Sequence, residues 1–218
     1  TVFYVTNLDH RFLSHRLERY EGGTPHVVGI WRTGLVMRLK KQVELAYQRI
    51  TASSLLTATL PPSLTEYECS TYQSVAAYWK EHAPNLVLLG HDENPHLPIF
   101  SFLIRCGERF LHYNYVCAVL NDVFGIQSRG GCQCAGPYSQ RLMGLTNTAA
   151  ADGGEEPPNS LNRRLEDALV KYKERAELLR PGYTRLSLPF KGLRSEEADY
   201  IKSAVAWVAK HGWALMCQ

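Results

Sequence analysis

The sequence contains no long apolar stretch and no block of like charge. None of its apolar runs approaches the roughly 18 to 20 residues that a membrane-spanning helix needs, so no membrane partner is expected. The 24 Lys and Arg and 21 Asp and Glu residues give a formal net charge of +3 and are interspersed. Such a pattern does not favour nucleic acid as a partner. With 218 residues, 45% of them hydrophobic, the chain can bury a substantial core.

Cysteine is scarce, and its spacing suits neither a disulfide scaffold nor zinc. Six cysteines at this length are too few for a disulfide framework. We therefore expect reduced thiols in a cytoplasmic compartment, and a reducing organelle would also fit. The Cys-x-Cys pair of Cys132 and Cys134 supplies only two soft ligands, and no second cysteine or histidine pair stands at a zinc-site spacing. No metal site is predicted.

The beginning of the chain has neither an initiator methionine nor the basic and apolar regions of a signal peptide. Residues 1–6, TVFYVT, instead have the composition of a β-strand. We therefore expect the sequence to be part of a longer protein whose N-terminal portion is not included.

Thr24-Pro25 predicts the start of a helix, because threonine can cap free amide groups and proline at the first helical position sacrifices no hydrogen bond. Apolar residues then recur at steps of three and four, which places them on one face of a long helix that is expected to form part of the spine of the molecule. These residues are Val28, Trp31, Leu35, Leu39, Val43, Ala46 and Ile50.

The remaining chain alternates helical and strand-like segments. Helices are predicted over 64–82, 113–124 (closed by Gly125), 161–179 and from Ser195 onward, and strands over 86–89, 99–104, 126–129 and 183–188. Segments rich in Ser, Thr, Pro, Gly and Ala predict mobile loops over about 51–63 and 147–159. This order predicts an α+β fold in which helices pack on one face of a small, mainly antiparallel sheet.

The densest chemical signal is Arg129-Gly130-Gly131-Cys132-Gln133-Cys134, followed by Ala-Gly-Pro-Tyr. A guanidinium can grip a carboxylate with two parallel hydrogen bonds, and a nearby thiol can act as a nucleophile if its pKa is lowered. Both properties suit an amino-acid substrate. The alternative is that Arg129 ends an edge strand in a surface ion pair and that both cysteines are merely small loop residues.

This loop resembles that of the class V aminotransferase and cysteine desulfurase family, which includes the selenocysteine lyases and has the type I fold of pyridoxal-phosphate enzymes. Two further segments are similar to the family in the expected order. They are Glu21-Gly22-Gly23-Thr24-Pro25, and Arg185-Leu186-Ser187-Leu188 followed by Ser195-Glu196-Glu197. The resemblance covers nearly the whole chain and implies the C-terminal small domain of such an enzyme.

The resemblance implies a role for each matching residue. Cys134 would accept the substrate's sulfur as a persulfide, Arg129 would help to hold the substrate, and Arg185 would bind its α-carboxylate. Gly23 and Thr24 would contact the pyridoxal phosphate of a partner subunit in a homodimer, and a helix N-terminus with a free hydroxyl suits such an anion. Without the resemblance, Arg185 would be a surface strand residue and Thr24 a simple helix cap.

The family holds its cofactor on a lysine that follows a histidine, upstream of the glycine-threonine segment. None of the eight lysines of this chain follows a histidine; they are Lys40, Lys41, Lys80, Lys171, Lys173, Lys191, Lys202 and Lys210. The resemblance therefore implies that the anchoring lysine lies before Thr1, and that this chain alone is inactive.

The resemblance also implies a division of the chain. Residues 1–25 would be a remnant of the cofactor-binding large domain, 26–52 a long connecting helix and 53–218 the small domain. Two functions remain open. The chain is either part of an enzyme that acts on an amino acid through pyridoxal phosphate, by transamination or by desulfuration, or a binding or scaffold module that retains the fold without catalysis.

Overall fold

The computed structural model describes residues 2–20, 24–53, 63–90, 95–133, 135–145, 160–171, 178, 180–189 and 194–217. It divides into two units, Thr1–Ser63 and Leu64–Gln218. The division falls within the segment predicted as the loop over 51–63. The identification of residues 1–25 as the remnant of a large domain stays a prediction.

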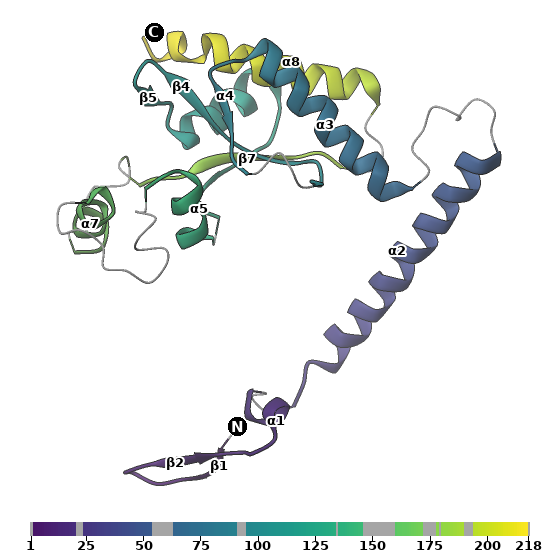
Figure 1. The fold of residues 1–218 in the computed structure, drawn as a ribbon, viewed down its shortest axis with the longest axis vertical. Coiled ribbons are helices and arrows are strands. Elements are labelled where there is room, and N and C mark those ends of the chain that lie inside the picture. The colour runs from purple at the N-terminus through teal and green to yellow at the C-terminus, as the bar shows by residue number, and fades with distance from the viewer. Residues whose placement is uncertain are drawn as a thin grey trace. The chain divides into compact units, whose positions relative to one another are not determined.

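The first unit consists of a hairpin and two helices (Figure 1). Strands β1 (Val2–Val5) and β2 (His10–Phe12) pair antiparallel. The turn between them is closed by Thr6, whose backbone N–H donates to the carbonyl of Asp9 at 2.8 Å. Helix α1 (Arg16–Tyr20) follows, and the long helix α2 runs over Val27–Ser53.

The structure adjusts the bounds of the long helix. Helix α2 begins at Val27, so Pro25 is not its first residue, and it ends at Ser53, close to the predicted end at 52 and within the segment predicted as loop. Its apolar stripe is exposed. Trp31 is 75% exposed and Leu39 is 58% exposed. A helical period alone does not bury a face, because burial requires a surface to pack against. Residues 54–62 lie outside the described residues.

The second unit is built on an antiparallel sheet. Its strands are β3 (Leu86–Leu88), β4 (Ile99–Cys106), β5 (Arg109–Phe110), β6 (Arg129–Gly131) and β7 (Tyr183–Ser187). The order is β3-β4-β7-β6, with β5 paired to β4, and every pair is antiparallel. The α+β prediction with a small antiparallel sheet is therefore confirmed at the level of fold class.

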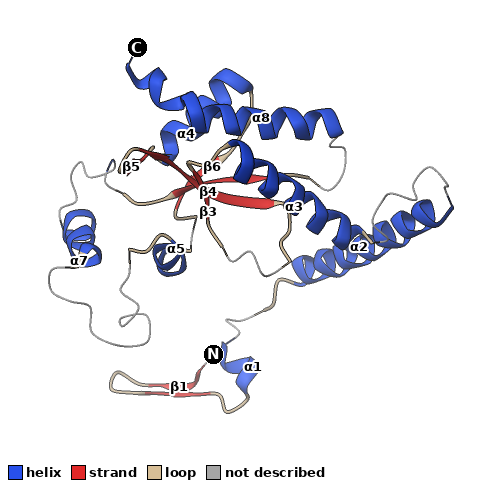
Figure 2. Cartoon of the chain, turned by 45° about the horizontal axis from the view of Figure 1, so that its top comes forward, coloured by secondary structure: helices blue, strands red, loops and turns tan. Residues whose placement is uncertain are grey.

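Three helices cover one face of this sheet, and a short helix lies on the other side (Figures 1 and 2). The covering helices are α3 (Leu64–His82), α4 (Tyr113–Phe124) and α8 (Ser195–His211), and the short one is α5 (Gly136–Leu142). The unit also contains α7 (Leu161–Glu166), a π-helical segment over Asp167–Lys171 and a 3-10 segment over Gly212–Cys217. The prediction of helices on one face omitted α5.

The core lies between the sheet and the three covering helices. Alternate residues of β4 point into it, and Phe100 and Phe102 are fully buried. Trp79 of α3 meets the Phe100 ring edge-on at 4.9 Å, while Val205 of α8 and Leu120 of α4 are also fully buried. The remaining residues of β4 and β7, which include Ser101 and Arg185, point to the opposite face, here called the open face.

Several local predictions are confirmed and one strand is corrected. Gly125 ends α4 in the left-handed conformation with φ of 67°, and Glu197 receives the backbone N–H of Arg194 at the start of α8. The strand predicted over 126–129 begins only at Arg129. The reason is that the backbone N–H of Ile126 donates to Leu120 in the closure of α4, so Ile126 belongs to the helix end.

No helix in the described part of the chain has the length and apolar character that crossing a membrane requires. The linker predicted over 147–159 lies outside the described residues. Of the helix predicted over 161–179, the structure describes α7 and the π-helical segment, which end at Lys171.

Candidate functional site

The two arginines predicted to bind substrate occupy directly opposing positions in the sheet. Arg129 of β6 is the Cα partner of Arg185 of β7, and Ser101 of β4 is the partner of Arg185 on its other side. Directly opposing residues in an antiparallel pair carry their side chains on the same face, with Cβ atoms about 4.5 to 5.5 Å apart. Both arginines therefore stand on the open face. Arg185 is half-buried and Arg129 is exposed.

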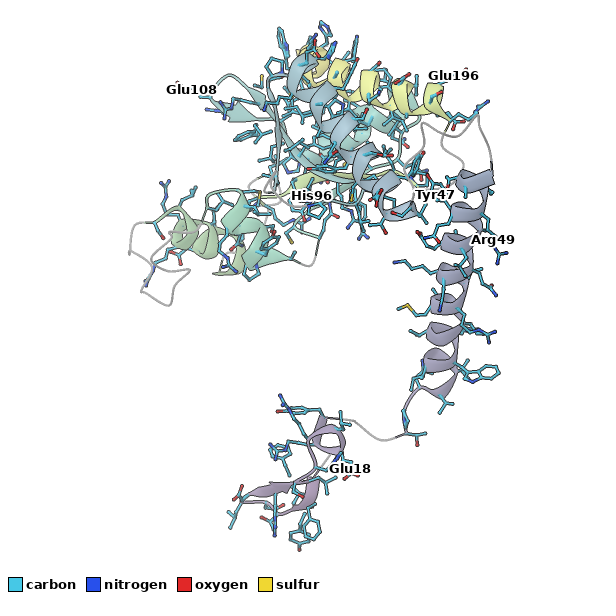
Figure 3. All side chains as sticks on the ribbon, turned by 45° about the vertical axis from the view of Figure 1, so that its right-hand side comes forward. Glu18, Tyr47, Arg49, His96, Glu108 and Glu196 are labelled. Carbon is cyan, nitrogen blue, oxygen red and sulfur yellow. The ribbon has the colours of Figure 1, made fainter. Side chains whose placement is uncertain are left out.

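No acidic residue balances this pair within the sheet. Strands β3 to β7 and helix α5 contain five arginines and neither aspartate nor glutamate. Among the described residues, no carboxylate forms a salt bridge with Arg129 or Arg185. Figure 3 shows Glu108 at the turn between β4 and β5 and Glu196 at the start of α8. These strands and α5 thus carry positive charge without an acidic residue of their own.

Like charges placed directly opposite each other destabilise a sheet, whereas a pair of guanidinium groups is well suited to grip one anion. The arrangement is therefore chemically suited to an anion. A carboxylate is the natural ligand, because its two oxygens match the parallel N–H donors of arginine.

A buried tyrosine under β6 explains the glycines beside Arg129. The Tyr113 side chain of α4 is 3% exposed. A Cβ atom added at Gly130 would lie 2.5 Å from the Tyr113 ring, and one at Gly182 would lie 2.6 Å from it. The Tyr113 hydroxyl accepts a hydrogen bond from Nε of Arg180 at 3.1 Å. Glycine at positions 130 and 182 leaves room for the Tyr113 ring. The backbone of β6, which carries Arg129, can therefore pack closely against α4.

Tyr183 extends the site along β7. It lies two residues before Arg185, faces the same side of the sheet and is 8% exposed. Burial raises the pKa of the Tyr183 hydroxyl above its ordinary value of 10.0, while the positive charge of Arg185 lowers that pKa by a smaller amount. The half-buried Cys132 and the hydroxyl of Tyr138 on α5 are also close enough to affect its charge. Tyr183 therefore remains a neutral hydrogen-bond donor at pH 7.

Sequence reasoning missed Tyr183, Tyr138 and Tyr113. For Tyr183 a signal was present, because the strand period of two puts it on the same face as Arg185. Tyr113 carried no comparable signal, since its role depends on the approach of α4 to β6.

The other predicted site residues lie either in the first unit or outside the described residues. Thr24 is an exposed residue of the first unit and lies three residues before α2, so it does not cap that helix. Gly23 and Cys134 lie outside the described residues. Cys132 is a free thiol. Within the described residues, no cluster of three or more His, Cys, Asp or Glu side chains is placed to hold a metal ion.

None of the second unit's lysines whose side chains are described lies on the open face. In the second unit, Lys80 lies on α3 and Lys202 and Lys210 lie on α8, the helices that cover the opposite face of the sheet. Nζ of Lys202 is engaged by Asp199 at 2.6 Å. The site thus fits a carboxylate, and the described chain does not show where the cofactor would be held.

A comparison with known protein families found no family model that matches this chain, and a comparison with curated proteins found no matching protein.

Proposed function

We propose that the second unit binds an α-amino acid through its carboxylate, as the substrate-binding domain of an enzyme that acts through pyridoxal phosphate. The observation that carries the proposal is the direct opposition of Arg129 and Arg185 on a face without acidic residues. The resemblance of the arginine and cysteine motifs to the class V aminotransferases and cysteine desulfurases supports the cofactor and the amino-acid substrate.

Each residue of the site has a defined task in this proposal. Arg185, which is half-buried, binds the carboxylate in a partly dry environment, where a charge-assisted hydrogen bond is strong. Arg129 contributes a second guanidinium from the neighbouring strand. The neutral Tyr183 hydroxyl donates to the same carboxylate or to a water beside it. Together they orient the amino acid on the sheet.

In this proposal, the lysine that anchors pyridoxal phosphate lies outside the described residues. When bound, the cofactor acts as the electron sink for chemistry at the substrate's α-carbon. Cys134 is proposed as the acceptor of sulfur if the enzyme is a desulfurase rather than an aminotransferase. Gly23 and Thr24 are proposed to contact the phosphate of the cofactor across a homodimer.

Binding of L-alanine and L-alaninamide tests the carboxylate site. The full chain should bind L-alanine more tightly than the amide, as measured by isothermal titration calorimetry. Arg185→Gln should weaken L-alanine binding about 10- to 100-fold, because a hydrogen bond to a charged group contributes about 1.5 to 3 kcal/mol. Arg105→Gln is the matched control, since Arg105 lies on the same sheet near β5, where Phe110 is its partner.

Equal affinity for L-alanine and its amide, or an Arg185→Gln variant that binds as the wild type does, would contradict the carboxylate site. The cofactor part has a separate test. Sequencing the encoding transcript upstream of Thr1 should reveal a histidine-lysine segment within a further domain. A start codon immediately before Thr1 would instead favour the alternative, a binding or scaffold module without catalysis.

A further inference from the structure

An open cavity of about 430 Å³ lies between α5 and the end of β3. Its size falls in the range of small-molecule sites. Val87 and Leu89 form part of its apolar wall, and Tyr138 and Arg141 of α5 line it from the other side. It therefore combines an apolar surface with one cation and one hydroxyl.

The register of the sheet connects this cavity to the arginine pair. The backbone N–H of Leu89 donates to the carbonyl of Ser101 at 2.8 Å, and Ser101 is the Cα partner of Arg185. Leu89, Ser101, Arg185 and Arg129 thus follow one another across the sheet. With neighbouring strands about 4.8 Å apart, the cavity wall at Leu89 lies about 10 Å from Arg185 along this row.

Tyr138 of α5 lies near both the cavity and Tyr183. It lines the cavity and is also near enough to Tyr183 to affect the ionisation of its hydroxyl, as Arg185 is. A ligand whose carboxylate meets Arg185 would extend past Tyr183 and Tyr138 into the cavity.

Arg141 gives the cavity its charge. Its side chain is exposed and forms no salt bridge with a carboxylate among the described residues. Helix α5 carries no acidic residue that could neutralise it. The guanidinium of Arg141 is therefore available to an anionic group that enters the cavity.

We propose that this cavity receives the side chain of the amino acid and that Arg141 selects a carboxylate there, so that the preferred ligand is a dicarboxylic α-amino acid. This inference rests on the proposed function, because it takes Arg185 and Arg129 as the site of the α-carboxylate. Arg185 and Arg129 of the sheet would then hold one carboxylate and Arg141 of α5 the other, with the aliphatic carbons against Val87 and Leu89.

The test compares each acid with its uncharged amide of the same shape. Titration calorimetry on the full chain should show that L-aspartate or L-glutamate binds about tenfold more tightly than L-asparagine or L-glutamine respectively, at constant ionic strength. In Arg141→Gln this preference should fall to about one. Arg141→Lys should retain part of the preference, because it keeps the positive charge.

The outcomes separate this inference from the proposed function. If the acids and amides bind equally well to the wild type, or if Arg141→Gln keeps the preference for the acid, the role of Arg141 is overturned while the carboxylate site stands. If none of the four amino acids binds, the proposed function fails and this inference fails with it. Arg185→Gln should weaken acids and amides alike, which distinguishes the α-carboxylate site from the cavity.

Discussion

Arg129 faces Arg185 directly across the antiparallel pair of β6 and β7. Two positive side chains in this position repel each other unless an anion lies between them. The sheet therefore carries an electrostatic cost in its free state, and a bound carboxylate would relieve it. This relationship makes the stability of the chain depend on the ligand, on salt and on either arginine.

Removal of one charge should stabilise the free protein. Arg129→Gln is expected to raise the free energy of unfolding by about 0.2 to 1 kcal/mol at low ionic strength, because it ends the repulsion of directly opposed like charges. High salt should shrink this gain, since screening shortens the range of the interaction to about 3 Å at 1 M. Urea denaturation at both salt concentrations measures the effect.

The control for this change is Arg105→Gln, because Arg105 pairs with Phe110 rather than with another cation. It should show no comparable gain. A loss of stability in Arg129→Gln at low salt would contradict the repulsion, because it would mean that an acidic group already neutralises the pair.

Gly130 should not tolerate a larger residue. Gly130→Ala places a Cβ atom 2.5 Å from the Tyr113 ring and should reduce the free energy of unfolding by about 1 to 3 kcal/mol through overpacking. Gly136→Ala is the matched control, since nothing lies within 4 Å of a Cβ atom at that position. Urea denaturation of both variants provides the comparison.

A double-mutant cycle identifies Tyr113 as the cause. In a Tyr113→Leu background, Gly130→Ala should cost less than in the wild type, because the ring that meets the new Cβ atom is gone. An unchanged cost would place the strain in the backbone of β6 instead.

The hydroxyl of Tyr183 should make the protein less stable at alkaline pH. Its folded-state pKa is raised by burial above the ordinary 10.0. Below pH 10 the hydroxyl is protonated in both states and its contribution is fully present. As the pH rises through the folded-state pKa, the unfolded state ionises first and this stability is lost.

Denaturation midpoints should be measured from about pH 9 to about pH 11, one unit on either side of the ordinary tyrosine pKa. They should fall more steeply with rising pH for the wild type than for Tyr183→Phe. Arg185→Gln should raise the pKa of Tyr183 further, because the Arg185 charge lowers it in the wild type. The tyrosinate absorbance difference between Tyr183-containing and Tyr183→Phe proteins reports this pKa directly. Identical dependence of the denaturation midpoint on alkaline pH in the wild type and in Tyr183→Phe would show that the Tyr183 hydroxyl is not buried.

Local sequence determined several elements of the second unit. The predicted bounds of α3 and α4 agree with the structure, since the apolar period of α4 ends at Gly125, a residue that adopts φ of 67° without strain. The start of α8 was equally readable, because Glu196 and Glu197 suit the positive end of a helix. These signals depend on residues that are a few positions apart in the chain, so the amino-acid sequence is sufficient to predict them.

Other features were not readable, because they depend on what packs against a segment. The apolar period of α2 predicts a helix with one apolar face but does not say what covers that face, and the structure leaves Trp31 and Leu39 exposed. Ile126 has the composition of a strand residue, yet it is drawn into the closure of α4 and is 8% exposed. Propensity is a weak prior wherever tertiary contacts decide the outcome.

The sequence by itself marked Arg129 and Arg185 as candidate carboxylate ligands, through their residue type and their motifs. Only the tertiary structure decided that they face each other. That relationship depends on β7 pairing between β4 and β6, and strand register is fixed by contacts between segments distant in the chain. The same register places Leu89, which lines the cavity, in the row of Ser101 and Arg185, because hydrogen-bonded partners continue across neighbouring strands.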